Sequence, residues 1–176
     1  MALINATPLL GVIQSYRLLW ILGKPGGHKT SLSYKFAQEF LEQGYRLITN
    51  NRTIWADDYH NVKLNEHNQL KAVINLYEGG LYFKSSRQIE NIASYAAKMD
   101  CIYFFPSFWP PPKAAQVIRV QPVVSLRATG IPIIIYSYLI DQGGFHDKGW
   151  FLLTFPQEIY CIYSRQDPGE DPCEIV

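Results

Sequence analysis

The chain has 176 residues, of which 48% are apolar and 18% charged, and its formal net charge is +1. This length fits one domain with a real hydrophobic core, and the composition excludes a disordered chain. The near-neutral charge excludes a general attraction to nucleic acid or anionic membranes. Cys101 and Cys161 lie in apolar runs, which favours buried thiols and a cytoplasmic setting. Polar residues interrupt the longest apolar stretch, 9–22, so we expect no membrane span and no signal peptide.

The first half of the chain is predicted to alternate strands and helices. Residues 17–22 form a short apolar run that ends at a Gly/Pro-rich turn, which is typical of a buried parallel strand. Apolar residues at helical spacing then predict a helix over residues 30–43, closed by Gly44. The next predicted elements are strands over residues 45–49, 71–77 and 101–105 and a helix over residues 86–99 with Ser85 or Ser86 as its N-cap.

The turn between the first strand and the first helix resembles a phosphate-binding loop. Residues 23–30, the candidate phosphate loop, have the sequence GKPGGHKT, to be compared with G-x-x-x-x-G-K-[ST]. In such loops backbone N–H groups and a helix N-terminus bind the phosphates, the lysine contacts the outer phosphates, and the hydroxyl binds Mg²⁺. ATP and Mg²⁺ are therefore the expected cofactors. The candidate binding residues are Gly23, Lys24, Pro25, Gly26, Gly27, His28, Lys29, Thr30 and Ser31.

His28 stands where the pattern has its last glycine. If φ is positive there, a side chain costs about 1–2 kcal/mol, although histidine tolerates this region better than most residues. We therefore expect weakened rather than abolished phosphate binding. The His28 side chain either donates a hydrogen bond to the phosphates or takes no part in binding them. For the whole segment, the alternative to a phosphate loop is an ordinary Gly/Pro turn.

The last third of the chain is predicted to be rich in β-structure. Residues 131–140 read as one more core strand, and residues 149–155 and 158–163 as a terminal hairpin. The predicted fold class is α/β, a three-layer P-loop NTPase sandwich with a mainly parallel central sheet and an antiparallel, β-rich C-terminal edge. Residues 1–164 would form this single domain, and residues 165–176 an acidic, Pro-containing tail.

A second motif of P-loop ATPases is an Asp-Glu pair at a later strand end, where Asp holds Mg²⁺ through water and Glu polarises the attacking water. This chain has Tyr77-Glu78. Glu78 is the candidate catalytic base and, with Thr30, a candidate metal ligand; the alternative is a solvated glutamate. Arg87 and Arg119 are candidate catalytic cations, in cis or from a neighbouring subunit, or else ordinary surface residues.

These motifs, in this order, resemble the FtsK–HerA superfamily of ASCE P-loop motors. Within it, the chain resembles the zonular occludens toxin (Zot) family of filamentous-phage assembly ATPases over residues 18–163. The family has a P-loop with its helix and strand, an acidic strand end followed by Ser-Arg, a sensor strand and a terminal strand. The matching segments are GKPGGHKTSLSYKFAQEFLEQGYRLITNN, INLYEGGLYFKSSRQ, CIYFFPS and IYCIYSRQDP.

The resemblance implies a homo-oligomeric ring such as a hexamer, ATP hydrolysis at subunit interfaces, and DNA translocation or virion assembly. DNA or virion-assembly proteins would be the partners, in the host cytoplasm if the chain is of viral or mobile-element origin. Tyr77 in place of Asp leaves open a nucleotide-binding structural subunit with little or no hydrolysis. Lys24 together with Lys29 leaves open a deviant P-loop like that of MinD and ParA, from which Pro25 and His28 depart.

Overall fold

The computed structural model describes residues 2–50, 71–113, 117–142 and 145–154. None of the helices in these ranges is both long and apolar enough to span a bilayer. In chain order the elements are β1 (Ala2–Ile4), α1 (Thr7–Tyr16), β2 (Leu18–Leu22), α2 (Lys29–Leu41), β3 (Arg46–Thr49), β4 (Ala72–Asn75), η2 (Gly79–Leu81), α3 (Ser86–Met99), β5 (Ile102–Ser107), β6 (Ile118–Ser125), η3 (Leu126–Thr129), β7 (Ile133–Gln142) and β8 (Phe145–Thr154).

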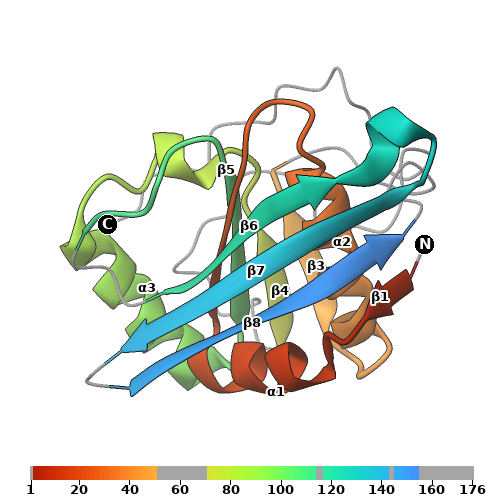
Figure 1. Cartoon of the computed structure of the whole chain (residues 1–176). Helices are drawn as coiled ribbons and strands as arrows, with labels where there is room; N and C mark the ends of the chain where they lie inside the picture. The colour runs from red at the N-terminus through yellow and green to blue at the C-terminus, as the bar shows by residue number, and fades with distance from the viewer. Residues whose placement is uncertain (1, 51–70, 114–116, 143–144, 155–176) are drawn as a thin grey trace.

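The strands form one mixed sheet in the order β1-β8-β7-β6-β2-β5-β4-β3 (Figure 1). The neighbours from β6 to β3 are all parallel, whereas β7 and β8 extend the sheet from β6 in antiparallel pairing and β1 closes that edge. The predicted α/β class, with parallel inner strands and an antiparallel C-terminal part, is confirmed. Parallel strands of one sheet need long crossover connections, and α2 lies in the connection from β2 to β3 and α3 in the connection from β4 to β5.

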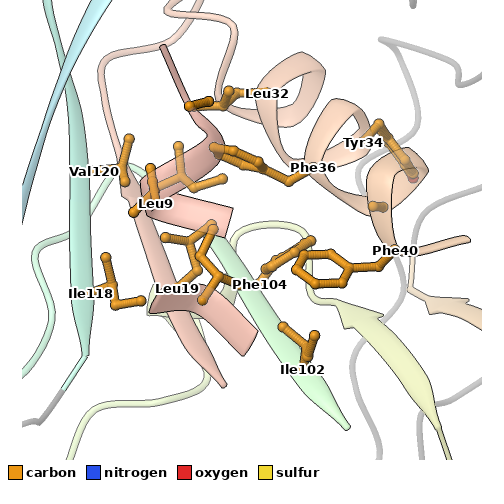
Figure 2. Close-up of a cluster of buried hydrophobic side chains, with 14 of the residues drawn as sticks. Leu9, Leu19, Leu32, Tyr34, Phe36, Phe40, Ile102, Phe104, Ile118 and Val120 are labelled. Carbon is orange, nitrogen blue, oxygen red and sulfur yellow. The ribbon is translucent and has the colours of Figure 1, made fainter. Parts of the chain in front are cut away.

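Helices cover both faces of the inner strands, which explains why those strands are continuous apolar runs. On one face, α1 and α2 pack in a cluster where the ring of Phe104 on β5 lies 6.3 Å from Phe36 and 6.2 Å from Phe40 (Figure 2). On the other face, Ile89 and Ile92 of α3 pack against the same strands. The parallel part of the sheet is therefore fixed from both sides.

Helix α3 has the bounds that its sequence predicts. Ser85 accepts a hydrogen bond from the Gln88 N–H, and the Gln88 side chain accepts one from the Ser85 N–H, which is a complete capping box. Helix α2 begins one residue before the predicted start and ends at Leu41. Gly44 follows it with φ of +82°, a conformation that glycine adopts without strain.

The predicted terminal hairpin lies partly outside the described residues. Its first segment belongs to β8, which pairs with β7 over its whole length and with β1 through Leu152–Thr154. Residues 158–163 and the tail 165–176 lie outside the described residues. Strand β1, helix α1 and strand β6 were not predicted. In β6, Pro122 and a register shift interrupt the regular pattern of a strand.

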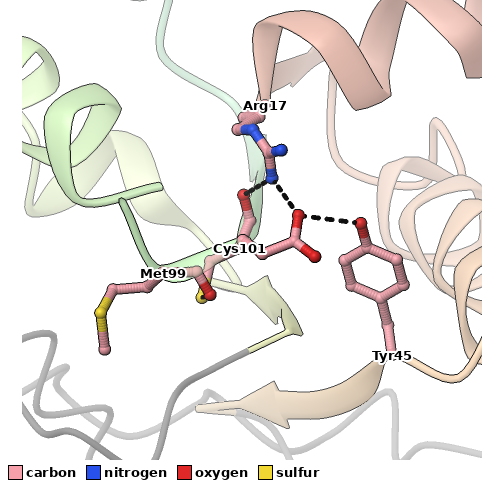
Figure 3. A network of polar contacts seen from close by, with 5 residues as sticks. Arg17, Tyr45, Met99 and Cys101 are labelled. Carbon is pink, nitrogen blue, oxygen red and sulfur yellow. Dashed lines mark hydrogen bonds and ion pairs between the residues drawn. The ribbon is translucent and has the colours of Figure 1, made fainter. Parts of the chain in front are cut away.

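A polar network ties together the strands at the sheet end where β2, β3 and β5 begin. The Arg17 guanidinium lies 2.7 Å from Asp100 Oδ1, which also accepts a hydrogen bond from the Tyr45 hydroxyl at 3.2 Å (Figure 3). Arg17 donates to the Cys101 carbonyl as well, at 3.4 Å. The predicted burial of Cys101 is confirmed, and this burial raises the pKa of its thiol. Cys161 lies outside the described residues.

Asn75, at the end of β4, is expected to reduce stability. It is 1% exposed, and neither of its amide atoms has a hydrogen-bond partner among the residues described. Because an unsatisfied buried amide costs about 1–3 kcal/mol, Asn75→Leu, of similar shape, should raise the free energy of unfolding by about 1 kcal/mol, measured by urea denaturation. Asn50→Leu is the matched control and should lower it, since Asn50 bonds both polar groups of the Tyr77 backbone. A less stable Asn75→Leu protein would contradict this account.

Candidate functional site

The candidate phosphate loop joins β2 to α2 at the end of the sheet where the parallel strands finish (Figure 1). It contains two left-handed residues, Gly26 with φ of +77° and His28 with φ of +57°. The Gly27 N–H donates to the Lys24 carbonyl at 2.9 Å, and a Cβ on Gly27 would lie 2.9 Å from that oxygen. The loop therefore requires its two central glycines, and His28 has the positive φ at which a side chain costs free energy.

Three strands hold the loop in place. The Gly23 N–H donates to the Ser107 carbonyl on β5 at 3.2 Å, and the Tyr136 hydroxyl on β7 donates to the Gly27 carbonyl at 3.2 Å. Pro122 on β6 packs against Gly23, where an added Cβ would lie 3.5 Å from Pro122 Cδ. The parallel and antiparallel parts of the sheet thus both determine the loop's conformation.

Lys29, the first residue of α2, is 7% exposed and turns its ammonium into the loop. Its Nζ lies 3.4 Å from the Lys24 carbonyl and 3.7 Å from Glu78 Oε1. Burial lowers the Lys29 pKa, and the Glu78 carboxylate partly opposes this shift. A buried cation beside helix N–H groups that take no part in the helix's own hydrogen bonds is the arrangement that binds an anion.

Glu78 reaches the loop from β4 although β5 lies between β4 and β2. Its backbone is left-handed, with φ of +51°, and Glu78 Oε2 accepts a hydrogen bond from the Phe108 N–H at 3.2 Å. Gly79 packs directly on Phe105, because a Cβ there would lie 2.7 Å from the Phe105 ring. The chain after β4 thus crosses β5 closely, and the structure brings Lys29 and Glu78 together.

Tyr77, in the position of the expected Asp, is held through its backbone. The Asn50 side chain accepts a hydrogen bond from the Tyr77 N–H at 2.7 Å and donates one to the Tyr77 carbonyl at 3.3 Å.

Within the described ranges, no three His, Cys, Asp or Glu side chains cluster as a metal site made of protein ligands alone would require. Mg²⁺ prefers oxygen ligands and keeps several waters, so the Thr30 hydroxyl and Glu78, together with bound phosphates, suit it.

The two predicted arginines lie apart from this ion pair. Arg87 is exposed in the first turn of α3. Arg119 is half-buried on β6, beside Trp20 of β2, and its neighbours Ile118 and Val120 face the α2 side of the sheet. In the described part of the chain, neither arginine forms an ion pair with Glu78.

Arg127 on η3 is a site residue that sequence reasoning missed. Its guanidinium contacts Nε2 of His28, and the Ser31 hydroxyl lies 3.5 Å from Nδ1 of the same ring. Arginine can only donate, so Nε2 is the acceptor in this contact. The His28 ring is therefore held between η3 and α2. No sequence pattern links these two distant positions, and only the fold reveals the contact.

A cleft of about 610 Å³ opens beside the loop. Residues 22–28 form one side of it, and residues 121–125 on β6, with Phe108, Pro110 and Ile134, form the rest. A pocket of this size is large enough for a small organic ligand.

Comparison with known proteins gives no further assignment. No protein-family model matches the chain, and a search of curated proteins found no significant match.

Proposed function

We propose that the chain binds ATP with Mg²⁺ at the candidate phosphate loop and that Glu78 promotes its hydrolysis. The observation that carries the proposal is the buried ammonium of Lys29 at the N-terminus of α2, 3.7 Å from the Glu78 carboxylate. Lys29 and Glu78 lie far apart in the sequence, and their roles were predicted separately. A phosphate chain in the loop would lie beside both residues.

Each residue has a distinct part in the proposed reaction. Backbone N–H groups of the loop and of the first turn of α2 bind phosphate oxygens, and Lys29 neutralises their charge. Thr30 offers its hydroxyl to Mg²⁺, which when bound neutralises charge on the outer phosphates. Glu78 accepts a hydrogen bond from the attacking water and takes its proton. Its second oxygen stays fixed by the Phe108 N–H.

Two measurements test the proposal. Isothermal titration of the wild-type chain with Mg-ATP and Mg-ADP should give saturable binding, and a phosphate-release assay should give turnover. Absence of binding to either nucleotide would remove the proposed function.

A second function is favoured by Tyr77. Without a carboxylate at this position, the chain lacks the side chain that holds Mg²⁺ through water in P-loop motors. The chain would then be a structural subunit that binds ATP and hydrolyses little of it. Tight ATP binding without phosphate release supports this function and contradicts the catalytic role of Glu78.

The resemblance to the Zot and FtsK–HerA motors supports a larger proposal. ATP hydrolysis would then occur in a ring of identical subunits and drive the movement of DNA or the assembly of a virion. Light scattering with and without Mg-ATP should reveal a nucleotide-dependent oligomer, and DNA should stimulate phosphate release. A monomer whose turnover does not respond to DNA would exclude the motor but not the nucleotide site.

ATP affinity should fall at alkaline pH. Burial lowers the Lys29 pKa below its ordinary value of 10.5, so the free protein loses this charge before pH 10.5 is reached. Bound phosphate favours the charged lysine, and affinity should therefore decrease by up to about tenfold per pH unit above the lowered pKa. Titration calorimetry across this range measures the effect. Lys29→Arg, which stays charged, should show no such decrease; an equal decrease in both proteins would contradict the assignment.

Removing the Arg127 charge should weaken ATP binding about fivefold, because a cation beside the loop is lost. Arg127→Met keeps the length of the side chain and should show this effect in titration calorimetry. Lys148→Met is the control, since Lys148 is an exposed cation on β8 whose strand partner is Leu139, towards the far end of β7. Unchanged affinity in Arg127→Met would limit Arg127 to positioning His28.

A further inference from the structure

The cleft beside the phosphate loop has an apolar wall that phosphates cannot use. This wall consists of Phe108, Pro110, Pro122, Val123, Val124 and Ile134. Its side chains carry no polar atom, yet Val123 is 59% exposed and Phe108 is 44% exposed. Apolar side chains left open in a concave site are typical of ligand pockets.

Strand β6 places this wall directly against the loop. The register between β6 and β7 shifts between Pro122 and Val124, so Val123 is the extra residue of a bulge. Bulges change the direction of side chains and are frequent beside functional sites. Pro122 also packs on Gly23, so the apolar wall contacts the first residue of the candidate phosphate loop.

The ligand part that suits the apolar wall is flat, uncharged and apolar on its faces. A nucleobase has these properties, and in a nucleotide the ribose connects it to the phosphates that the loop would hold. Two polar side chains, Gln121 and Ser125, line the same cleft. The Gln121 amide offers both a donor and an acceptor, which suits the polar edge of a base.

We propose that the apolar wall is the binding site for a purine base, with its face on the wall and its edge at Gln121. This inference rests on the proposed nucleotide function and specifies which nucleotides the site takes. A purine covers more of the wall than a pyrimidine because its ring system is larger, so ATP should bind more tightly than CTP.

The test compares ATP, CTP and inorganic tripolyphosphate by titration calorimetry, each with Mg²⁺. Wild-type protein should bind ATP about tenfold more tightly than tripolyphosphate, the value expected for one stacked base. The double variant Phe108→Ser, Val124→Ser should lose this difference and still bind tripolyphosphate as the wild type does. Phe108 is 44% exposed and Val124 is 40% exposed, so their replacement removes less buried apolar surface than a core substitution would.

Trp150→Ser is the matched control, since Trp150 is 56% exposed on β8 and does not line the cleft. It should leave all three affinities unchanged. Equal affinities of the wild type for ATP and tripolyphosphate would overturn the base site but not the proposal that the loop binds phosphate. CTP binding as tightly as ATP would overturn the purine preference. If neither ATP nor tripolyphosphate binds, the proposed function fails and the base site with it.

Discussion

Lys29→Ala is expected to weaken the binding of Mg-ATP about 100-fold, as measured by titration calorimetry. The Lys29 ammonium is buried at the helix N-terminus, where its hydrogen bonds to phosphate would be shielded from water. The substitution removes these bonds and leaves the negative charge of Glu78 beside the phosphates. Both effects act in the same direction, so the loss should exceed that from any exposed cation.

Lys35→Ala is the matched control for this substitution. Lys35 is a buried lysine on the same helix, but its ammonium pairs with Glu39 at 2.9 Å. Its loss should leave ATP affinity unchanged. Circular dichroism establishes that both variants are folded. If Lys29→Ala binds ATP as the wild type does, the loop is an ordinary turn between a strand and a helix.

Glu78→Gln is expected to lower the rate of phosphate release about 1000-fold without weakening ATP binding. Glutamine can still accept the hydrogen bond from the Phe108 N–H, so the chain after β4 should keep its path. It cannot take a proton from water. The substitution also removes the ion pair with Lys29, which leaves this lysine available to phosphate. Steady-state phosphate release and titration calorimetry measure the two effects separately.

Glu39→Gln controls for the loss of an ion pair alone. It breaks the pair with Lys35, which lies on the same helix but outside the loop, and should leave turnover unchanged. A Glu78→Gln protein that retains wild-type turnover would show that another group activates water.

The parts of the fold that could be predicted are those determined by neighbouring residues. The strand, loop and helix around Lys29 follow from a short apolar run, a glycine-rich turn and helical spacing. The limits of α3 follow from its capping box. The proximity of Lys29 and Glu78 was expected on different grounds, because each residue was compared with a sequence motif of P-loop ATPases.

The remaining features depend on pairings between distant segments. Arg127 reaches His28 only because β6 lies beside β2 and ends at η3, and no local pattern determines that strand order. The pairing of β7 with β8 was not predicted, because alternating apolar residues show that a strand exists but not which strand lies beside it. The apolar wall was missed for the same reason, since its residues come from β6, β7 and the chain after β5.

The two hydrogen bonds between the Asn50 side chain and the Tyr77 backbone affect which residues position 77 can accept. Both polar groups of the Tyr77 backbone bond to Asn50, and any residue except proline at position 77 could make these two hydrogen bonds. Tyrosine and aspartate codons differ by a single base, and a carboxylate at this position is therefore one mutational step away. An aspartate at position 77 would keep both hydrogen bonds to Asn50 and would place a carboxylate next to Glu78 in the chain.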